Sequence, residues 1–141
     1  TMIIDELMGV AVGENSTGVN STLRYHFRHD NPANEAFVAA YREKHGAFPS
    51  QFAGEAFDGM TWFLDVVDKS GSWDPEAWLE AFRGSVHETS IEGVKRMRPC
   101  DNQAEQVGLF GRAIEGSDPY PPVTMEITHT FEAELLFEPC N

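Results

Sequence analysis

The chain has 141 residues, of which 41% are hydrophobic and 11% aromatic, and its formal net charge is −13. This size and hydrophobic content predict one globular domain with a hydrophobic core and argue against a disordered chain. The negative charge would repel phosphate groups, so we expect no nucleic-acid partner. No apolar run in the chain approaches the roughly 20 residues that a membrane-spanning helix needs.

The run LMGVAVG at residues 7–13 is short, apolar and ended by a glycine, and it predicts a buried strand. Three helices are predicted next, at about 32–45, at Gln51 to Ser70 and at about 75–83. Residues suited to cap or stop these helices flank them: Asn31, Gly46, Ser50, Gly71, Asp74 and Gly84.

The second of these helices carries apolar residues at steps of three and four positions, which predicts one wide buried face. The residues of this face are Ala53, Ala56, Phe57, Met60, Phe63, Leu64 and Val67.

The chain after Gly84 changes from helical to strand-like patterns, and 91–98, 104–116 and 123–131 are predicted as strands. The fold class is therefore α/β. Because few strands precede the helices, their sheet comes either from the late strands or from sequence outside this chain.

The histidines and nearby acidic residues are the first candidates for a metal site. His26, His29 and Asp30 lie close together in HFRHD and could suggest a metal site, but no third strong ligand follows at a matching spacing. A solvated loop is the favoured interpretation. The sequence contains no nucleophile elbow, no phosphate-binding glycine loop and no CxxC. We therefore expect no catalytic residue, no metal, no cofactor and no enzymatic activity.

The chain contains only two cysteines, Cys100 and Cys140. Both lie in polar turns beside prolines, and this context favours a disulfide, which would indicate an oxidising compartment. Two free thiols in a cytosolic protein are the alternative. A catalytic thiol would need a nearby base, and the sequence offers none.

Three segments together resemble a known family: NPANEAFVAAYREKHGAFPSQFAGEAFDGM, GSWDPEAWLEAFRG and EGVKRMRPCDNQAEQVGLFGRA. In this order they are similar to the C-terminal part of the periplasmic solute-binding proteins of branched-chain amino acid ABC transporters. The family's turn of the form Gly-x-x-x-Arg-x-x-Asp-x-Gln corresponds here to Gly93, Arg96 or Arg98, Asp101 and Gln103. The resemblance runs from about residue 8 to residue 113. Phe57 stands where the family often has tyrosine.

The resemblance implies the C-terminal part of a two-lobed type I periplasmic-binding fold, with helices on a mostly parallel sheet and late strands crossing between lobes. Residues 1–92 would supply first-lobe helices with the preceding inter-lobe strand. Residues 93–141 would supply the crossing segment, strands and tail of the second lobe. The rest of both lobes is expected upstream, in the same protein or in a swapped partner chain that covers the apolar helix faces.

The resemblance also implies a function: a small solute, an amino acid or a related acid or amide, is bound between the lobes and delivered to an ABC permease. Phe52, with Glu55 next, is the candidate ligand-binding residue; a plain core position for Phe52 and an exposed helix position for Glu55 are the simpler alternatives. The expected location is periplasmic or extracellular, with lipid anchoring through upstream sequence as one route. A sensory or regulatory module of the same fold is the alternative function, and an enzyme with its site in missing sequence is a third.

Overall fold

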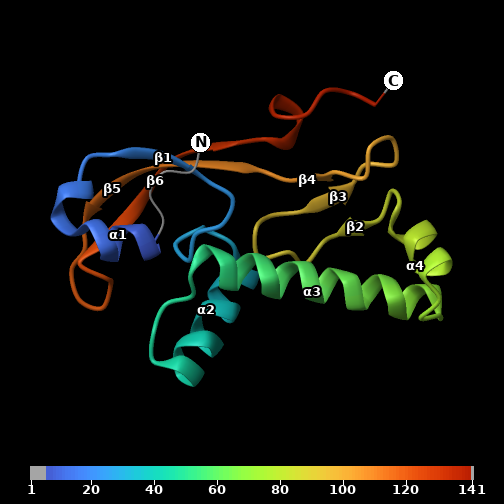
Figure 1. The fold of residues 1–141 in the computed structure, drawn as a ribbon, viewed down its shortest axis with the longest axis horizontal. Helices are drawn as coiled ribbons and strands as arrows, with labels where there is room; N and C mark the ends of the chain where they lie inside the picture. The colour runs from blue at the N-terminus through green and yellow to red at the C-terminus, as the bar shows by residue number, and fades with distance from the viewer. Residues whose placement is uncertain (1–5, 141) are drawn as a thin grey trace.

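The computed structural model describes residues 6–140, and their elements fall into two groups joined end to end (Figure 1). The first group, called the strand body below, contains α1 (Glu6–Val12), η1 (Gly13–Ser16), β1 (Asn20–Leu23), β5 (Gly108–Glu115) and β6 (Val123–Phe131). The second group, called the helical body, contains α2 (Pro32–His45), α3 (Gln51–Ser70), α4 (Pro75–Phe82), β2 (Val86–His87), β3 (Lys95–Met97) and β4 (Ala104–Glu105). A 3-10 turn, η2 (Ala133–Leu135), lies in the C-terminal tail.

The sheet of the strand body has the order β1-β5-β6, with antiparallel pairing throughout. β1 runs toward the helical body, so that Leu23 pairs with Leu109 at the end of β5 nearest that body. Alternate side chains of the three strands point to one face and form a hydrophobic core. The core residues are Leu23, Leu109, Ala113, Val123 and Met125. The predicted strand at 123–131 is confirmed.

The helical body has its own small antiparallel sheet, of order β2-β3-β4. α3 runs along this sheet and α4 packs against α3 (Figure 1). A second hydrophobic cluster, of Tyr25, Phe27 and Ile91, joins the segment after β1 to α2 and to the loop between β2 and β3. The mixed helix and sheet content confirms the α/β class.

The predicted helix ends are confirmed, because local side chains satisfy the free backbone groups there. Asn31 accepts a hydrogen bond from the Ala33 amide, and Ser50 accepts one from the Ala53 amide. Gly71 ends α3 with φ 65°, in the left-handed region that suits glycine. The remaining predicted caps are also in place: Gly46 at φ 67°, Asp74 accepting from the Glu76 amide, and Gly84 at φ 73° after α4.

The predicted strand at 7–13 is wrong: residues 6–12 form helix α1 and residues 13–16 a 3-10 turn. A short apolar run cannot be assigned by periodicity alone, and here contact with β6 favours the helix. Gly9 lies against Val123, and a Cβ at Gly9 would stand 3.6 Å from the Val123 side chain. This is an ordinary van der Waals distance, so α1 lies in contact with β6 at Gly9.

The predicted buried face of α3 is also wrong for the chain as described. Phe57 is 43% exposed, Met60 is 56% exposed and Leu64 is 47% exposed. Val67 is the residue of the predicted face that is buried, and the buried side of α3 otherwise carries Gln51, Gly54, Asp58, Trp62 and Val66. The apolar stripe therefore forms an exposed surface, which we call the α3 apolar face (Phe57, Met60, Leu64).

The chain passes between the two bodies in three places: residues 24–30 lead from β1 to α2, residues 106–107 lead from β4 to β5, and the tail after β6 returns to the helical body. Figure 1 shows the tail, in red, running back above β4. A helix both long and apolar enough to cross a bilayer is not found within residues 6–140.

Candidate functional site

The two candidate ligand-binding residues lie at the start of α3. Phe52 and Glu55 are three positions apart, so their side chains project from the same side of the helix. Phe52 is 55% exposed and therefore is not a core residue in the described chain. Glu55 is half-buried, so it is not the exposed helix residue that the simpler alternative describes.

Glu55 is held by Arg24, which follows β1 at the start of the first connection between the bodies. Arg24 Nε lies 2.9 Å from Glu55 Oε1, and its Nη2 donates to Oε2 at 2.9 Å. This two-point contact fixes the carboxylate plane and ties the connection to α3. The sequence gives no signal for Arg24, because Arg24 and Glu55 are 31 positions apart and form no periodic pattern.

Beneath this pair, Tyr25 and Gly54 bring the connection and α3 into close contact. Tyr25 is fully buried, and a Cβ placed on Gly54 would stand 2.4 Å from the Tyr25 ring. Only glycine allows this approach without displacing the ring. The position of Phe52 and Glu55 relative to the connection therefore depends on Gly54.

A buried cluster of charges supports the next turn of α3. Asp58 Oδ1 accepts from the backbone amide of Ile91 at 2.8 Å, and Oδ2 accepts from the Ser90 hydroxyl at 3.0 Å. Lys95 Nζ lies 2.8 Å from Asp58 Oδ2 and 2.7 Å from Glu92 Oε2. These contacts assign Asp58 a structural role. Burial raises the pKa of Glu92, although Lys95 acts in the opposite direction.

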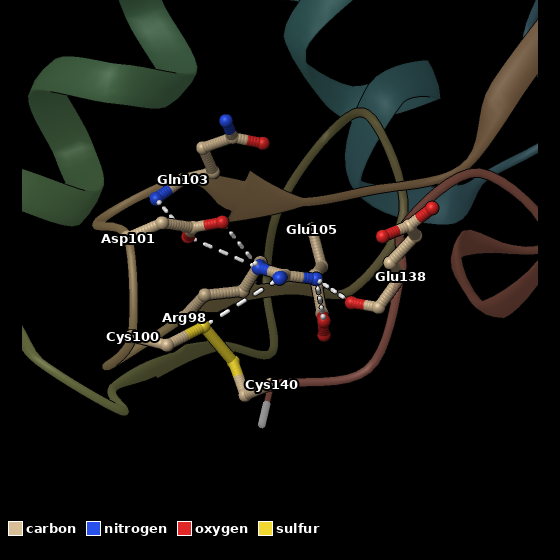
Figure 2. Close-up of a disulfide and its surroundings, with 7 residues drawn as sticks. All are labelled: Arg98, Cys100, Asp101, Gln103, Glu105, Glu138 and Cys140. Carbon is tan, nitrogen blue, oxygen red and sulfur yellow. Dashed lines mark hydrogen bonds and ion pairs between the residues drawn. A yellow bond between two sulfur atoms is a disulfide. The ribbon is translucent and has the colours of Figure 1, made fainter.

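The disulfide between Cys100 and Cys140 is formed, with sulfur atoms 2.01 Å apart, and it fastens the C-terminal tail to the turn after β3 (Figure 2). The favoured interpretation of the two cysteines is thus confirmed. Arg98 is the arginine of the turn motif: its Nε donates to both Asp101 carboxylate oxygens at 3.0 Å. The backbone amide of Gln103 donates to the same carboxylate at 3.0 Å.

Arg98 also holds the tail directly. One of its terminal nitrogens, Nη1, donates to the backbone carbonyl of Glu138 (Figure 2). Its guanidinium also lies 5.8 Å from the centre of the Phe137 ring. Farther back, a Cβ on Gly108 would stand 2.7 Å from Leu136, so the tail packs closely on the start of β5. The sequence suggested the cysteine pairing, but it left Arg96 and Arg98 unresolved.

The histidine group HFRHD does not form a metal site in the structure. His26 is fully buried, and its Nδ1 accepts a hydrogen bond from the Arg28 amide at 3.1 Å. Burial lowers the pKa of His26 to about 3, and the charge of Arg28 adds to this effect. The favoured interpretation of HFRHD as a solvated loop is wrong for His26. Within the described part of the chain, no cluster of three or more His, Cys, Asp or Glu residues could hold a metal ion.

Comparison with known proteins identifies the family. A family model described as periplasmic binding protein matches residues 4–118. The leucine-, isoleucine-, valine-, threonine- and alanine-binding protein of Pseudomonas aeruginosa is 32% identical over 84 residues, which are 60% of this chain and 22% of that protein. The chain thus spans less than a quarter of this relative's length. The relatives are named as binding proteins or transporter components, in agreement with a non-enzymatic chain.

Solved structures share the fold. A branched-chain amino acid transporter protein from Rhodopseudomonas palustris superposes with a TM-score of 0.82 at 22% identity, over 99% of this chain and 37% of that one. A solute binding protein of an ABC transporter from the same species, in complex with p-hydroxybenzoic acid, gives a TM-score of 0.75 at 26% identity, over 92% of this chain and 35% of that one. The family match over most of its length shows that the chain belongs to the periplasmic binding proteins.

Proposed function

We propose that the chain is the C-terminal part of a two-lobed extracytoplasmic receptor that binds a small solute and delivers it to an ABC permease. The observation that carries the proposal is the family match across residues 4–118. The two bodies joined by three connections support it, because solute receptors of this kind close by a hinge between lobes. Solute binding favours the closed state through its higher affinity for that state, and no bond is made or broken.

In this proposal residues 1–92 supply first-lobe helices and the inter-lobe strand before them, and residues 93–141 supply the crossing segment, strands and tail of the second lobe. The α3 apolar face would be covered by the upstream part of the protein or by a swapped partner chain. The strand pairs described here are antiparallel. The mostly parallel sheet of the full fold would therefore come from upstream sequence.

The ligand would lie against Phe52, with Glu55 beside it. Glu55 contacts Arg24 in the first connection between the bodies, and Phe52, on the same side of α3, presents an exposed ring that a bound solute would cover. Because Arg24 neutralises Glu55, a direct ion pair between Glu55 and a ligand ammonium would need this pair to open. Phe52 is therefore the stronger candidate for direct contact.

The names and bound ligands of the relatives indicate two kinds of solute. The Pseudomonas protein is named for leucine, isoleucine, valine, threonine and alanine. Two ABC solute binding proteins of Rhodopseudomonas palustris were solved with 3,4-dihydroxybenzoic acid and p-hydroxybenzoic acid. We propose an amino acid or a related small acid or amide. The disulfide agrees with a periplasmic or extracellular location. A lipid anchor, if present, would lie upstream.

The proposal is tested by thermal unfolding of the complete receptor with a panel of amino acids, amides and small aromatic acids. A true ligand raises the melting temperature in a concentration-dependent manner. Phe52→Ala should weaken binding of that ligand about tenfold or more, which corresponds to about 1.4 kcal/mol. Trp73→Ala is the matched control, since Trp73 is also an exposed aromatic residue but follows the other end of α3. The receptor proposal is wrong if no compound in the panel shifts the melting temperature.

A further inference from the structure

A cavity of about 440 Å³ lies where the two bodies meet, away from Phe52 and Glu55. Its walls come from one side of α2, from the first connection at residues 27–30, from the loop before α3, and from the loop between β5 and β6. Its size is within the range usual for small-molecule sites. Both bodies therefore contribute to one open pocket.

Aromatic rings form one wall of the cavity. Phe27 stacks on Phe48 with ring centres 4.4 Å apart, and on Tyr120 with ring centres 6.0 Å apart. Val38 extends the apolar surface from α2. An aromatic ligand ring would find edge and face contacts along this wall.

Two arginines line the same cavity, and each is held against a ring. The Arg42 guanidinium lies 4.3 Å from the centre of the Phe48 ring, and the Arg28 guanidinium lies 5.1 Å from that of Tyr120. The ion pairs found within residues 6–140 do not involve either arginine. Stacking orients a guanidinium and leaves N–H groups at its edge available for a carboxylate. Arg28 uses one of its terminal nitrogens, Nη1, to donate to the Met125 carbonyl at 3.5 Å.

Two acids balance these charges. Asp30 and Glu35 also line the cavity and can accept hydrogen bonds from an ammonium group. His29 lines the same pocket and is partly buried; burial lowers its pKa, although Asp30 acts in the opposite direction. The cavity thus offers two cations, two anions and an aromatic wall.

We propose that this cavity binds a small aromatic zwitterion, such as an aromatic amino acid. The arginines bind its carboxylate, the acids bind its ammonium group, and the rings of Phe27 and Phe48 pack against its side chain. A simple carboxylate would leave Asp30 and Glu35 without a counterpart, and a simple amine would leave Arg28 and Arg42 without one. A molecule that carries both a carboxylate and an ammonium group offers a counterpart to all four of these side chains.

Binding at this cavity would also stabilise the arrangement of the two bodies. Tyr120 belongs to the strand body, and Arg42 belongs to the helical body. A ligand in contact with both residues is bound only while the two walls stay together, so it favours that arrangement by its differential affinity. The inference does not depend on transport, because it uses residues of this chain alone.

The test uses L-phenylalanine titrated calorimetrically into the complete polypeptide that contains this chain. Three probes each lack one feature: phenethylamine lacks the carboxylate, 3-phenylpropionate lacks the ammonium group and L-alanine lacks the ring. We expect each to bind at least tenfold more weakly than L-phenylalanine. Arg42→Gln should weaken L-phenylalanine binding at least tenfold, while Arg83→Gln, at an exposed arginine paired with Glu80 on α4, should leave it unchanged.

Phe52→Ala separates this cavity from the proposed transport site. If L-phenylalanine binding is lost in Phe52→Ala and retained in Arg42→Gln, the ligand occupies the transport site and the inference is overturned. Failure of L-phenylalanine to bind overturns it as well, without touching the receptor proposal. Arg42→Lys keeps the positive charge but removes the planar guanidinium that stacks on Phe48. It provides a second variant if Arg42→Gln fails to fold, and it too should bind L-phenylalanine more weakly.

Discussion

Asp58 on α3 and Lys95 on β3 form a buried ion pair, with 2.8 Å between Oδ2 and Nζ. Their side chains are 1% and 8% exposed, so each charge depends on the other for solvation. Asp58 also binds Ser90 and the Ile91 amide and thereby fastens the loop between β2 and β3 to the helix. Asp58 therefore connects α3 to the sheet of the helical body.

Asp58→Ala is expected to lower the free energy of unfolding by about 3–5 kcal/mol, because it leaves Lys95 with a buried charge that lacks one of its partners. Urea denaturation of the two proteins measures this. Asp65→Ala is the matched control on the same helix: Asp65 is more exposed and pairs with Lys69 at the surface, so we expect a loss of no more than about 0.5 kcal/mol. Equal losses for the two variants would contradict the assignment.

His26 makes stability depend on pH in the acid range. Its pKa is about 3 in the folded protein and 6.5 in the reference state. Because the folded pKa is depressed, the unfolded chain binds the extra proton between these values, so the contribution is present above pH 6.5 and lost as pH falls toward 3. The loss should be on the order of a few kcal/mol. His26→Phe should show a smaller loss of unfolding free energy between pH 6.5 and pH 4, and identical slopes would disprove the buried neutral imidazole.

Glu92 acts in the opposite direction. Burial raises its folded pKa above the ordinary value of 4.5, so its contribution is fully present below pH 4.5 and is lost as pH rises through the folded pKa. Glu92→Gln cannot titrate. We therefore expect the unfolding free energy of the variant, relative to the natural protein, to rise as pH increases above 4.5. A difference that does not change with pH would mean that Glu92 is ionised in both states.

Gly54 and Gly59 provide opposite outcomes from the same substitution in one helix. A Cβ at Gly54 would overlap the Tyr25 ring, so Gly54→Ala should destabilise the protein by about 1–3 kcal/mol. Apart from the neighbouring backbone of α3, no atom of residues 6–140 stands within 4 Å of a Cβ at Gly59, so Gly59→Ala should be neutral or stabilise by up to about 1 kcal/mol. Thermal unfolding of both variants decides this. A Gly54→Ala protein as stable as the natural one would show that Tyr25 can move aside.

The disulfide closes a stretch of chain between residues 40 positions apart. In the chain-entropy account, loss of this link costs about 4 kcal/mol. Replacing Cys100 and Cys140 together by serine should therefore lower the unfolding free energy by up to that amount, measured without reductant. Intact mass after alkylation gives an independent check: two alkylated cysteines before reduction would show that the bond is absent in solution.

The features that the sequence predicted correctly are mostly local. Asn31 and Ser50 cap helices through amides two or three residues away, and Gly71 stops α3 through its own backbone angle. The run at 7–13 was assigned wrongly because its conformation depends on β6, which lies more than 100 positions later in the chain. Local pattern cannot distinguish a short apolar helix from a short apolar strand without that partner.

For this protein the sequence by itself determined the boundaries of α2, α3 and α4, the strand at 123–131, the family and the favoured cysteine pairing, because helix caps, strand alternation and motif order can be read from the sequence. Only the tertiary structure decided which side of α3 is buried, which arginine holds the tail, and that Arg24 faces Glu55. Those facts depend on contacts between segments far apart in the chain. Polar residues such as Asp58 leave the surface only when such a contact satisfies their charge.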